Sequence, residues 1–147
     1  MKHLVTVIDW YGPYTLEEAI DSCKENFAEG LYLCLGKTKG QRGKSRIQYI
    51  GIAGFDINTR LKDPKHKIHT VTRDQKLLLG EVNSLGVPGK KLKKTNPSLD
   101  FAEWALVYFL KSELNEKKTV QADPEQHRAA YPHVGFSFCH SAGRLLN

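Results

Sequence analysis

Glu103 is the single carboxylate in FAEWALVYFL, a stretch from Phe101 to Leu110 whose other residues are almost all apolar. Such a run predicts a helix that is buried on most of its sides. An isolated buried carboxylate is strongly disfavoured unless a cation, a metal ion or hydrogen bonds compensate for the lost water. Glu103 is therefore a candidate for a structural ion pair with an arginine, or for binding a hard divalent cation.

Tyr32 and Tyr49 are a second pair of residues that could do chemistry. They lie in two β-rich runs, GLYLCLG and RIQYIGIAG, and a glycine stands close to each. A tyrosine in a strand commonly serves packing alone. A phenol can also act as a general base where nearby cations favour its ionised form. Arg60 follows shortly after, and its permanent charge suits a phosphate.

The histidines and cysteines show no spacing that is typical of a zinc site. The three cysteines are odd in number and form no CxxC pair, so we expect free, buried thiols. A zinc-binding module is a minor alternative, because only the types of the available ligands support it. Its ligands would be His66, His69, Cys139 and His140.

Positive charge is concentrated in two segments, GKTKGQRGKSR at residues 36–46 and GKKLKK at residues 89–94, in a chain of net charge +6. Such segments are often ordinary solvated surface. They also suit a phosphate backbone, which rewards lysine and arginine contacts through counterion release. The candidate nucleic-acid contacts are Lys44, Arg46, Lys90, Lys91, Lys93 and Lys94.

Capping and turn residues predict the elements of the N-terminal part. Residues 3–8 are rich in β-branched types and predict a strand, which the turn former Gly12-Pro13 follows. Thr15 with Glu18 forms a capping box, which predicts an amphipathic helix that ends before Gly30.

The two tyrosine-bearing runs that follow predict a β-hairpin with a long, basic loop. Asp56 then caps a short helix that Pro64 interrupts or ends. Residues 76–82 predict a third strand, and a long helix opens at Ser98 or Asp100 and continues to about Leu114. Residues 134–140 predict a final strand.

Five elements, in order and spacing, resemble the motif series of the GIY-YIG nuclease family: Gly30-Leu31-Tyr32, Tyr49-Ile50-Gly51, Arg60, Glu103 and Asn115. The resemblance covers residues 30–118 and implies an α+β nuclease core with a small three-stranded antiparallel sheet flanked by helices. Residues 1–29 would add a strand and a helix, and residues 119–147 a C-terminal extension, to a single domain of residues 1–147.

The resemblance implies a Mg²⁺-dependent endonuclease that hydrolyses phosphodiester bonds in DNA. Glu103 would bind the ion, for which Mn²⁺ could substitute, and Arg60 would stabilise the phosphate. Tyr32 would be the general base, and Tyr49 would orient the water or share that role. Asn115 follows Glu103 by about 18 Å if the helix is continuous, which is too far to share its ion. We therefore expect Asn115 to brace a neighbouring loop or to cap the helix.

Two positions depart from the family pattern. Some members carry a histidine one helical turn after the arginine, where this chain has Pro64. His66 and His69 follow and could substitute as auxiliary groups, the alternative being solvated surface. Ile52 stands where some relatives have a lysine, so Lys44 or Arg46 would have to supply that charge.

The rival interpretation is a non-catalytic nucleic-acid-binding or assembly module that retains the fold, and RNA remains open as a substrate. No apolar run reaches the length of a membrane span, and the N-terminal residues do not resemble a signal peptide, so we expect a cytoplasmic protein. A stand-alone, restriction-like enzyme is the favoured biological role. It would act as a homodimer, because one active site cuts one strand.

Overall fold

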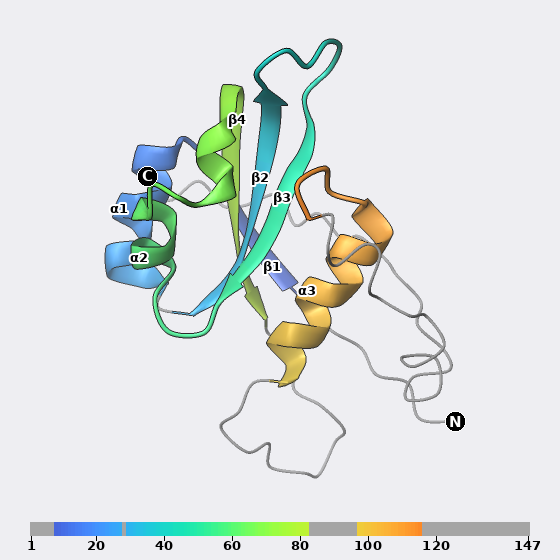
Figure 1. Ribbon diagram of the computed structural model, residues 1–147. Helices are drawn as coiled ribbons and strands as arrows, with labels where there is room; N and C mark the ends of the chain where they lie inside the picture. The colour runs from blue at the N-terminus through green and yellow to red at the C-terminus, as the bar shows by residue number, and fades with distance from the viewer. Residues whose placement is uncertain (1–7, 28, 83–96, 116–147) are drawn as a thin grey trace, which may run out of the picture.

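A four-stranded antiparallel sheet in the order β1-β4-β2-β3 forms the centre of the computed structural model, with helices on both of its faces (Figure 1). The structure describes residues 8–27, 29–82 and 97–115. Its elements are β1 (Ile8–Tyr14), α1 (Leu16–Asn26), β2 (Gly30–Thr38), β3 (Arg46–Ala53), α2 (Ile57–Lys62), the 3-10 helix η1 (Lys67–Thr70), β4 (Val71–Val82) and α3 (Pro97–Leu110). The predicted α+β class is confirmed.

The sheet has four strands rather than the three that the resemblance implies. The additional strand β1 pairs with the outer edge of β4, where Ile8 lies opposite Val82 and Tyr11 opposite Leu79. The N-terminal strand was expected at residues 3–8, of which only Ile8 lies within the described residues. The sequence predicts a turn at Gly12-Pro13, but β1 stays paired with β4 beyond these residues. The register of this pairing shifts between Tyr11 and Tyr14. An edge strand tolerates proline because one side of its backbone needs no partner.

The predicted helix boundaries are mostly confirmed. In the capping box of α1, the Thr15 hydroxyl accepts from the Glu18 amide at 3.3 Å, and the Thr15 amide donates to the Glu18 carboxylate at 2.7 Å. The Asp56 carboxylate caps α2, which ends shortly before Pro64. The long helix α3 stops earlier than predicted, because Lys111 adopts a left-handed backbone conformation with φ of 47°.

Alternating side chains along the strands divide the core into two clusters. On one face, Tyr32 and Cys34 of β2 pack with α1, α2 and η1. On the other face, Leu31, Leu33 and Ile50 pack with α3. Figure 1 shows this arrangement, with α1 and α2 on one side of the sheet and α3 on the other.

Several predictions from the sequence fall outside the described residues. They are the final strand at residues 134–140, the basic segment with Lys90, Lys91, Lys93 and Lys94, and the thiol of Cys139. Within the described part, the other two cysteines are free and buried, as expected. No helix of that part is long and apolar enough to cross a membrane.

Candidate functional site

Tyr32, Tyr49 and His66 form one aromatic cluster on the α2 side of the sheet. The rings of the two tyrosines are stacked with centroids 6.0 Å apart, and the His66 ring stands edge-on to both, at 5.6 Å from Tyr32 and 4.9 Å from Tyr49. Tyr32 is completely buried, whereas Tyr49 is half-buried. The hairpin therefore brings the two predicted tyrosines together, and Tyr49 is the one nearer to solvent.

Gly51 makes room for this cluster. It lies directly opposite Tyr32 in the β2–β3 pairing. A Cβ atom at Gly51 would lie 2.5 Å from the Tyr32 hydroxyl oxygen and 2.7 Å from a ring carbon of Tyr49. The glycine of the second tripeptide is therefore required for space, since any side chain would displace both tyrosine rings.

Replacing Gly51 with alanine should lower the free energy of unfolding by about 1 to 3 kcal/mol, because the added methyl group overpacks the cluster. Gly54→Ala is the matched control, since a Cβ at Gly54 meets no atom within 4 Å. Urea unfolding of both variants measures the difference. Equal stability of the two variants would contradict the steric role of Gly51.

The hydrogen bonds of His66 define which of its ring nitrogens carries the proton. The Ile68 amide donates to Nδ1 at 3.2 Å, so in the neutral ring the proton lies on Nε2. Nε2 then donates to the Tyr32 hydroxyl oxygen, 2.8 Å away. His66 is 8% exposed, so the alternative of solvated surface is wrong for this residue. His69 is only partly buried and bonds the Leu61 carbonyl instead.

Burial lowers the pKa of His66 from 6.5 to about 4, and the positive charge of Arg60 acts in the same direction. Between these two values the unfolded chain binds more protons than the folded chain. The contribution of His66 to stability is therefore complete above pH 6.5 and is lost as the pH falls toward 4.

We expect the wild type to lose about 3 kcal/mol more stability than His66→Asn between pH 7 and pH 4, from the shift of the His66 pKa alone. Asparagine retains a side chain that can cap η1 but does not titrate. Urea unfolding at both pH values, in both proteins, isolates this effect from all other titrating groups. Parallel pH profiles for the two proteins would show that His66 is not held neutral.

Arg60 links the cluster to solvent. It is exposed on α2 and lies close enough to Tyr32 and Tyr49 for both tyrosines to raise its pKa. Burial and the neighbouring Tyr49 raise the pKa of Tyr32, and the hydrogen bond and charge of Arg60 only partly oppose them. Tyr32 is therefore a neutral phenol. His66 donates a hydrogen bond to its oxygen.

Asn115 braces the outer edge of β3 instead of capping α3. Its Oδ1 accepts from the Ile50 amide at 2.9 Å, and its Nδ2 donates to the Ile50 carbonyl at 2.8 Å. The Ser112 hydroxyl donates to the same Oδ1 at 2.6 Å. The amide of Leu114 adds a bond to the Gln48 carbonyl at 2.8 Å. Asn115 thus braces a strand rather than the neighbouring loop that we expected, and it holds Ile50, the residue between Tyr49 and Gly51.

Glu103 is buried, with 4% of its surface exposed, as its sequence context predicts. It lies on α3, which packs against the sheet face opposite the Tyr32 ring. The chain that follows α3 passes round the edge of β3, because Leu114 packs against the tyrosine side and its carbonyl accepts from Lys67 at 2.7 Å. The structure thus places α3 next to the edge strand that carries Tyr49, with Glu103 on the far face.

A zinc site that uses His66 is incompatible with its hydrogen bonds, because both ring nitrogens already have partners. No group of three or more His, Cys, Asp or Glu side chains that could hold a metal ion occurs among the described residues. The other two ligands of that alternative, Cys139 and His140, lie outside them.

The structure thus brings Tyr32, Tyr49 and His66 into contact, places Arg60 close to both tyrosines, and sets Asn115 against the outer edge of β3. Lys44 and Arg46 lie in and beside the β2–β3 loop, and both are exposed. Comparison of the chain with protein-family models, with curated proteins and with solved structures finds no match.

Proposed function

We propose that this chain is a divalent-metal-dependent endonuclease that hydrolyses phosphodiester bonds in DNA. The observation that carries the proposal is the pair of stacked tyrosines on adjacent strands, with the exposed cation Arg60 close enough for both of them to raise its pKa. A permanent cation beside a phenol can bind a phosphate and hold a water molecule next to it. The resemblance to the GIY-YIG motif series supports the same chemistry.

Tyr49 is the phenol that we assign to the attacking water, in place of Tyr32. Tyr32 is completely buried and neutral, so it cannot reach substrate in this conformation. Tyr49 is half-buried, its ring is stacked on Tyr32 and stands edge-on to His66, and Arg60 lies nearby. Tyr32 and His66 are then positioning residues that orient Tyr49, and Arg60 binds the phosphate that is attacked.

Glu103 is the residue that would hold a metal ion. A carboxylate is a ligand that Mg²⁺ prefers, and a single protein carboxylate is sufficient when water and phosphate oxygens supply the other ligands. When bound, the ion would stabilise negative charge on the phosphate and on the leaving oxygen. Glu103 lies on α3, on the sheet face opposite the Tyr32 ring, so an ion held by Glu103 would have to reach the phosphate at the edge of β3. Substitution of Glu103 tests this assignment directly.

A non-catalytic nucleic-acid-binding module is the second candidate. Two observations favour it: burial raises the pKa of Tyr32, and α3 places Glu103 across the sheet from that tyrosine. Such a module would bind DNA equally well with and without metal and would cut nothing.

Incubation of purified protein with supercoiled plasmid, in Mg²⁺ and in chelator, tests the proposal. We expect cleavage in Mg²⁺ only. Discrete linear fragments would indicate a restriction-like enzyme that cuts both strands, which requires two sites and hence a homodimer. Nicked circles would indicate cleavage of one strand. Absence of cleavage on plasmid, branched DNA and RNA would overturn the nuclease and favour the binding module.

A further inference from the structure

The loop between β2 and β3, residues 39–45, extends beyond the end of the sheet (Figure 1). Its sequence, KGQRGKS, contains no apolar side chain that could be buried against the body of the protein. A loop of this composition would ordinarily be held only by its two ends.

Polar side chains nevertheless brace this loop from within. Gln48 of β3 is 1% exposed, and its Nε2 donates to the Gly36 carbonyl and to the Gln41 Oε1, both at 2.8 Å. The same Oε1 accepts from the Thr38 amide at 3.1 Å. Arg73 of β4 donates to the backbone carbonyls of Thr38 and Gln41. A buried amide and an arginine are thus used to give a fully polar loop a fixed shape.

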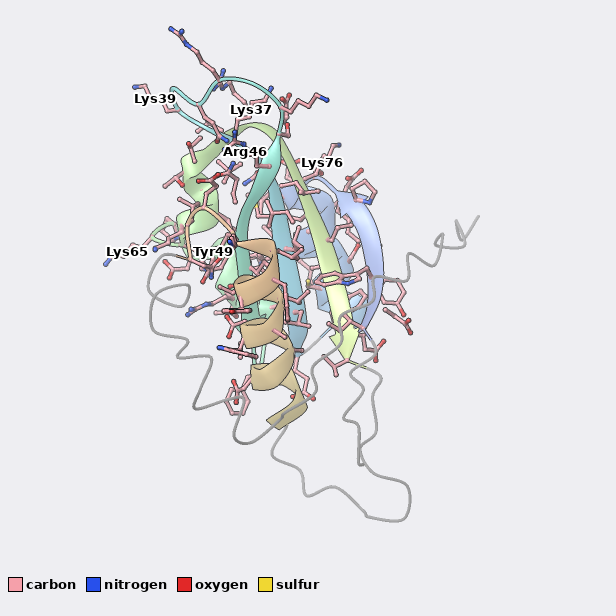
Figure 2. The ribbon with its side chains drawn as sticks, turned by 90° about the vertical axis from the view of Figure 1, so that its right-hand side faces the viewer. Lys37, Lys39, Arg46, Tyr49, Lys65 and Lys76 are labelled. Atoms are coloured by element: carbon pink, nitrogen blue, oxygen red, sulfur yellow. The ribbon has the colours of Figure 1, made fainter. Side chains whose placement is uncertain are left out.

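Charges along the loop are neutralised at its base and not at its tip. Lys37 pairs with Asp74 at 2.9 Å, and Arg46 pairs with Glu113 at 3.0 Å. By contrast, three exposed cations between these pairs form no ion pair within the described residues: Lys39, Arg42 and Lys44. Figure 2 shows Lys39 at the projecting end, beyond Lys37 and Arg46. The result is a projecting hairpin loop with a cationic tip, carried by two strands that pair with each other as far as Gly36 and Arg46.

We infer that the β2–β3 loop enters the major groove of B-form DNA, where Lys39, Arg42 and Lys44 contact the phosphates and base edges. The major groove of B-form DNA is wide enough for a two-stranded ribbon and hence for this hairpin loop, whereas that of A-form RNA is too narrow. The absence of apolar side chains from the loop argues against insertion into a membrane. This inference deepens the proposed function and rests on it in taking DNA as the substrate.

The loop also lies at a suitable distance from the candidate active site. Arg46, at the base of the loop, precedes Tyr49 by three residues on β3. At the rise of a strand this spacing corresponds to about 10 Å. A duplex that holds the loop in one groove would therefore carry its backbone close to Tyr49 and Arg60.

Binding of a labelled mixed-sequence DNA duplex, measured in chelator over a range of salt concentrations, tests the inference. We expect Lys39→Ala with Lys44→Ala to reduce the slope of log K against log salt by about 0.9 for each lost phosphate contact, about 1.8 in all. The matched control is Lys24→Ala with Lys76→Ala, which removes two exposed lysines from α1 and β4 and should leave the slope unchanged.

A third variant, Gln41→Ala, removes the acceptor that braces the loop and leaves its charge intact. It should weaken DNA binding several-fold without changing the salt slope, since the cations remain but are less well placed. Equal slopes for the loop variant and the lysine control would overturn the inference, as would equally tight binding to an RNA duplex of the same sequence. Binding is measured in chelator and does not depend on cleavage. If the plasmid assay shows no nuclease activity, the binding result therefore still tests the role of the loop.

Discussion

Arg60→Ala should reduce the rate of DNA cleavage by about 10²- to 10³-fold, the usual effect of removing one preorganised donor from a developing phosphate charge. The loss should be mainly in kcat, because the guanidinium is expected to interact most strongly with the transition state. Arg60→Lys should recover only part of the activity, since an ammonium group cannot reproduce the planar fork with which a guanidinium binds a phosphate.

Lys62→Ala is the control for this experiment, because Lys62 is exposed on the same helix and carries the same charge. It should cleave at close to the wild-type rate. Single-turnover kinetics with all three variants and a spectroscopic check of folding separate chemistry from stability. Comparable cleavage by Arg60→Ala and Lys62→Ala would remove Arg60 from the mechanism.

Asn115→Ala should lower the free energy of unfolding by about 2 to 5 kcal/mol, the largest stability effect that we expect. The substitution leaves the buried amide and carbonyl of Ile50 without partners, and each such group costs about 1 to 3 kcal/mol. Ser112→Ala removes only one of the bonds to the same side chain and should cost about 1 kcal/mol. Urea unfolding of both variants measures which substitution lowers the free energy of unfolding more. Equal losses for the two variants would contradict the bracing role of Asn115.

The brace also explains how an edge strand can carry part of a site. β3 is the outermost strand of the sheet, so its outer backbone groups would otherwise be open to water or to another chain. Asn115 and Leu114 occupy that edge at Ile50 and Gln48. Tyr49 lies between Gln48 and Ile50. Its strand is therefore held there by the brace on the outer edge and by the pairing with β2 on the inner edge.

Local signals were sufficient to predict most of the elements. The capping box at Thr15, the Asp56 cap and the stop before Pro64 depend only on residues close in sequence, and all three are confirmed. The hairpin that joins Tyr32 to Tyr49 follows from two β-rich runs with a polar connection, and it is also confirmed.

Long-range features could not be predicted from such signals. β1 joins the sheet by pairing with the free edge of β4. The sequence of β1 alone does not indicate that this edge is available. The alternation of β2 predicts that Leu31 and Tyr32 face opposite sides, but not that α3 covers the side of Leu31. The separation of Glu103 from the Tyr32 ring was therefore not foreseeable from the motif order.

Three members of the candidate site were predicted from the sequence, but their separate roles were not. Motif spacing identified Tyr32, Tyr49 and Arg60, whereas the burial that distinguishes the two tyrosines is a tertiary property. His66 was an open alternative, and its hydrogen bonds to Tyr32 and Ile68 depend on how η1 folds against the sheet. The bracing role of Gln48 was missed, although a polar residue in a β-rich run was a usable signal.

Cleavage of supercoiled plasmid by Glu103→Gln, compared with wild type in Mg²⁺, tests the central claim most directly. Glutamine preserves the shape of the buried side chain and removes the charge that would hold the ion. Glu113→Gln is the control, because Glu113 is exposed and its ion pair with Arg46 is a surface contact. We predict that Glu103→Gln stays folded and loses Mg²⁺-dependent cleavage, while Glu113→Gln retains it. Undiminished cleavage by Glu103→Gln would contradict a metal-dependent mechanism based on this residue.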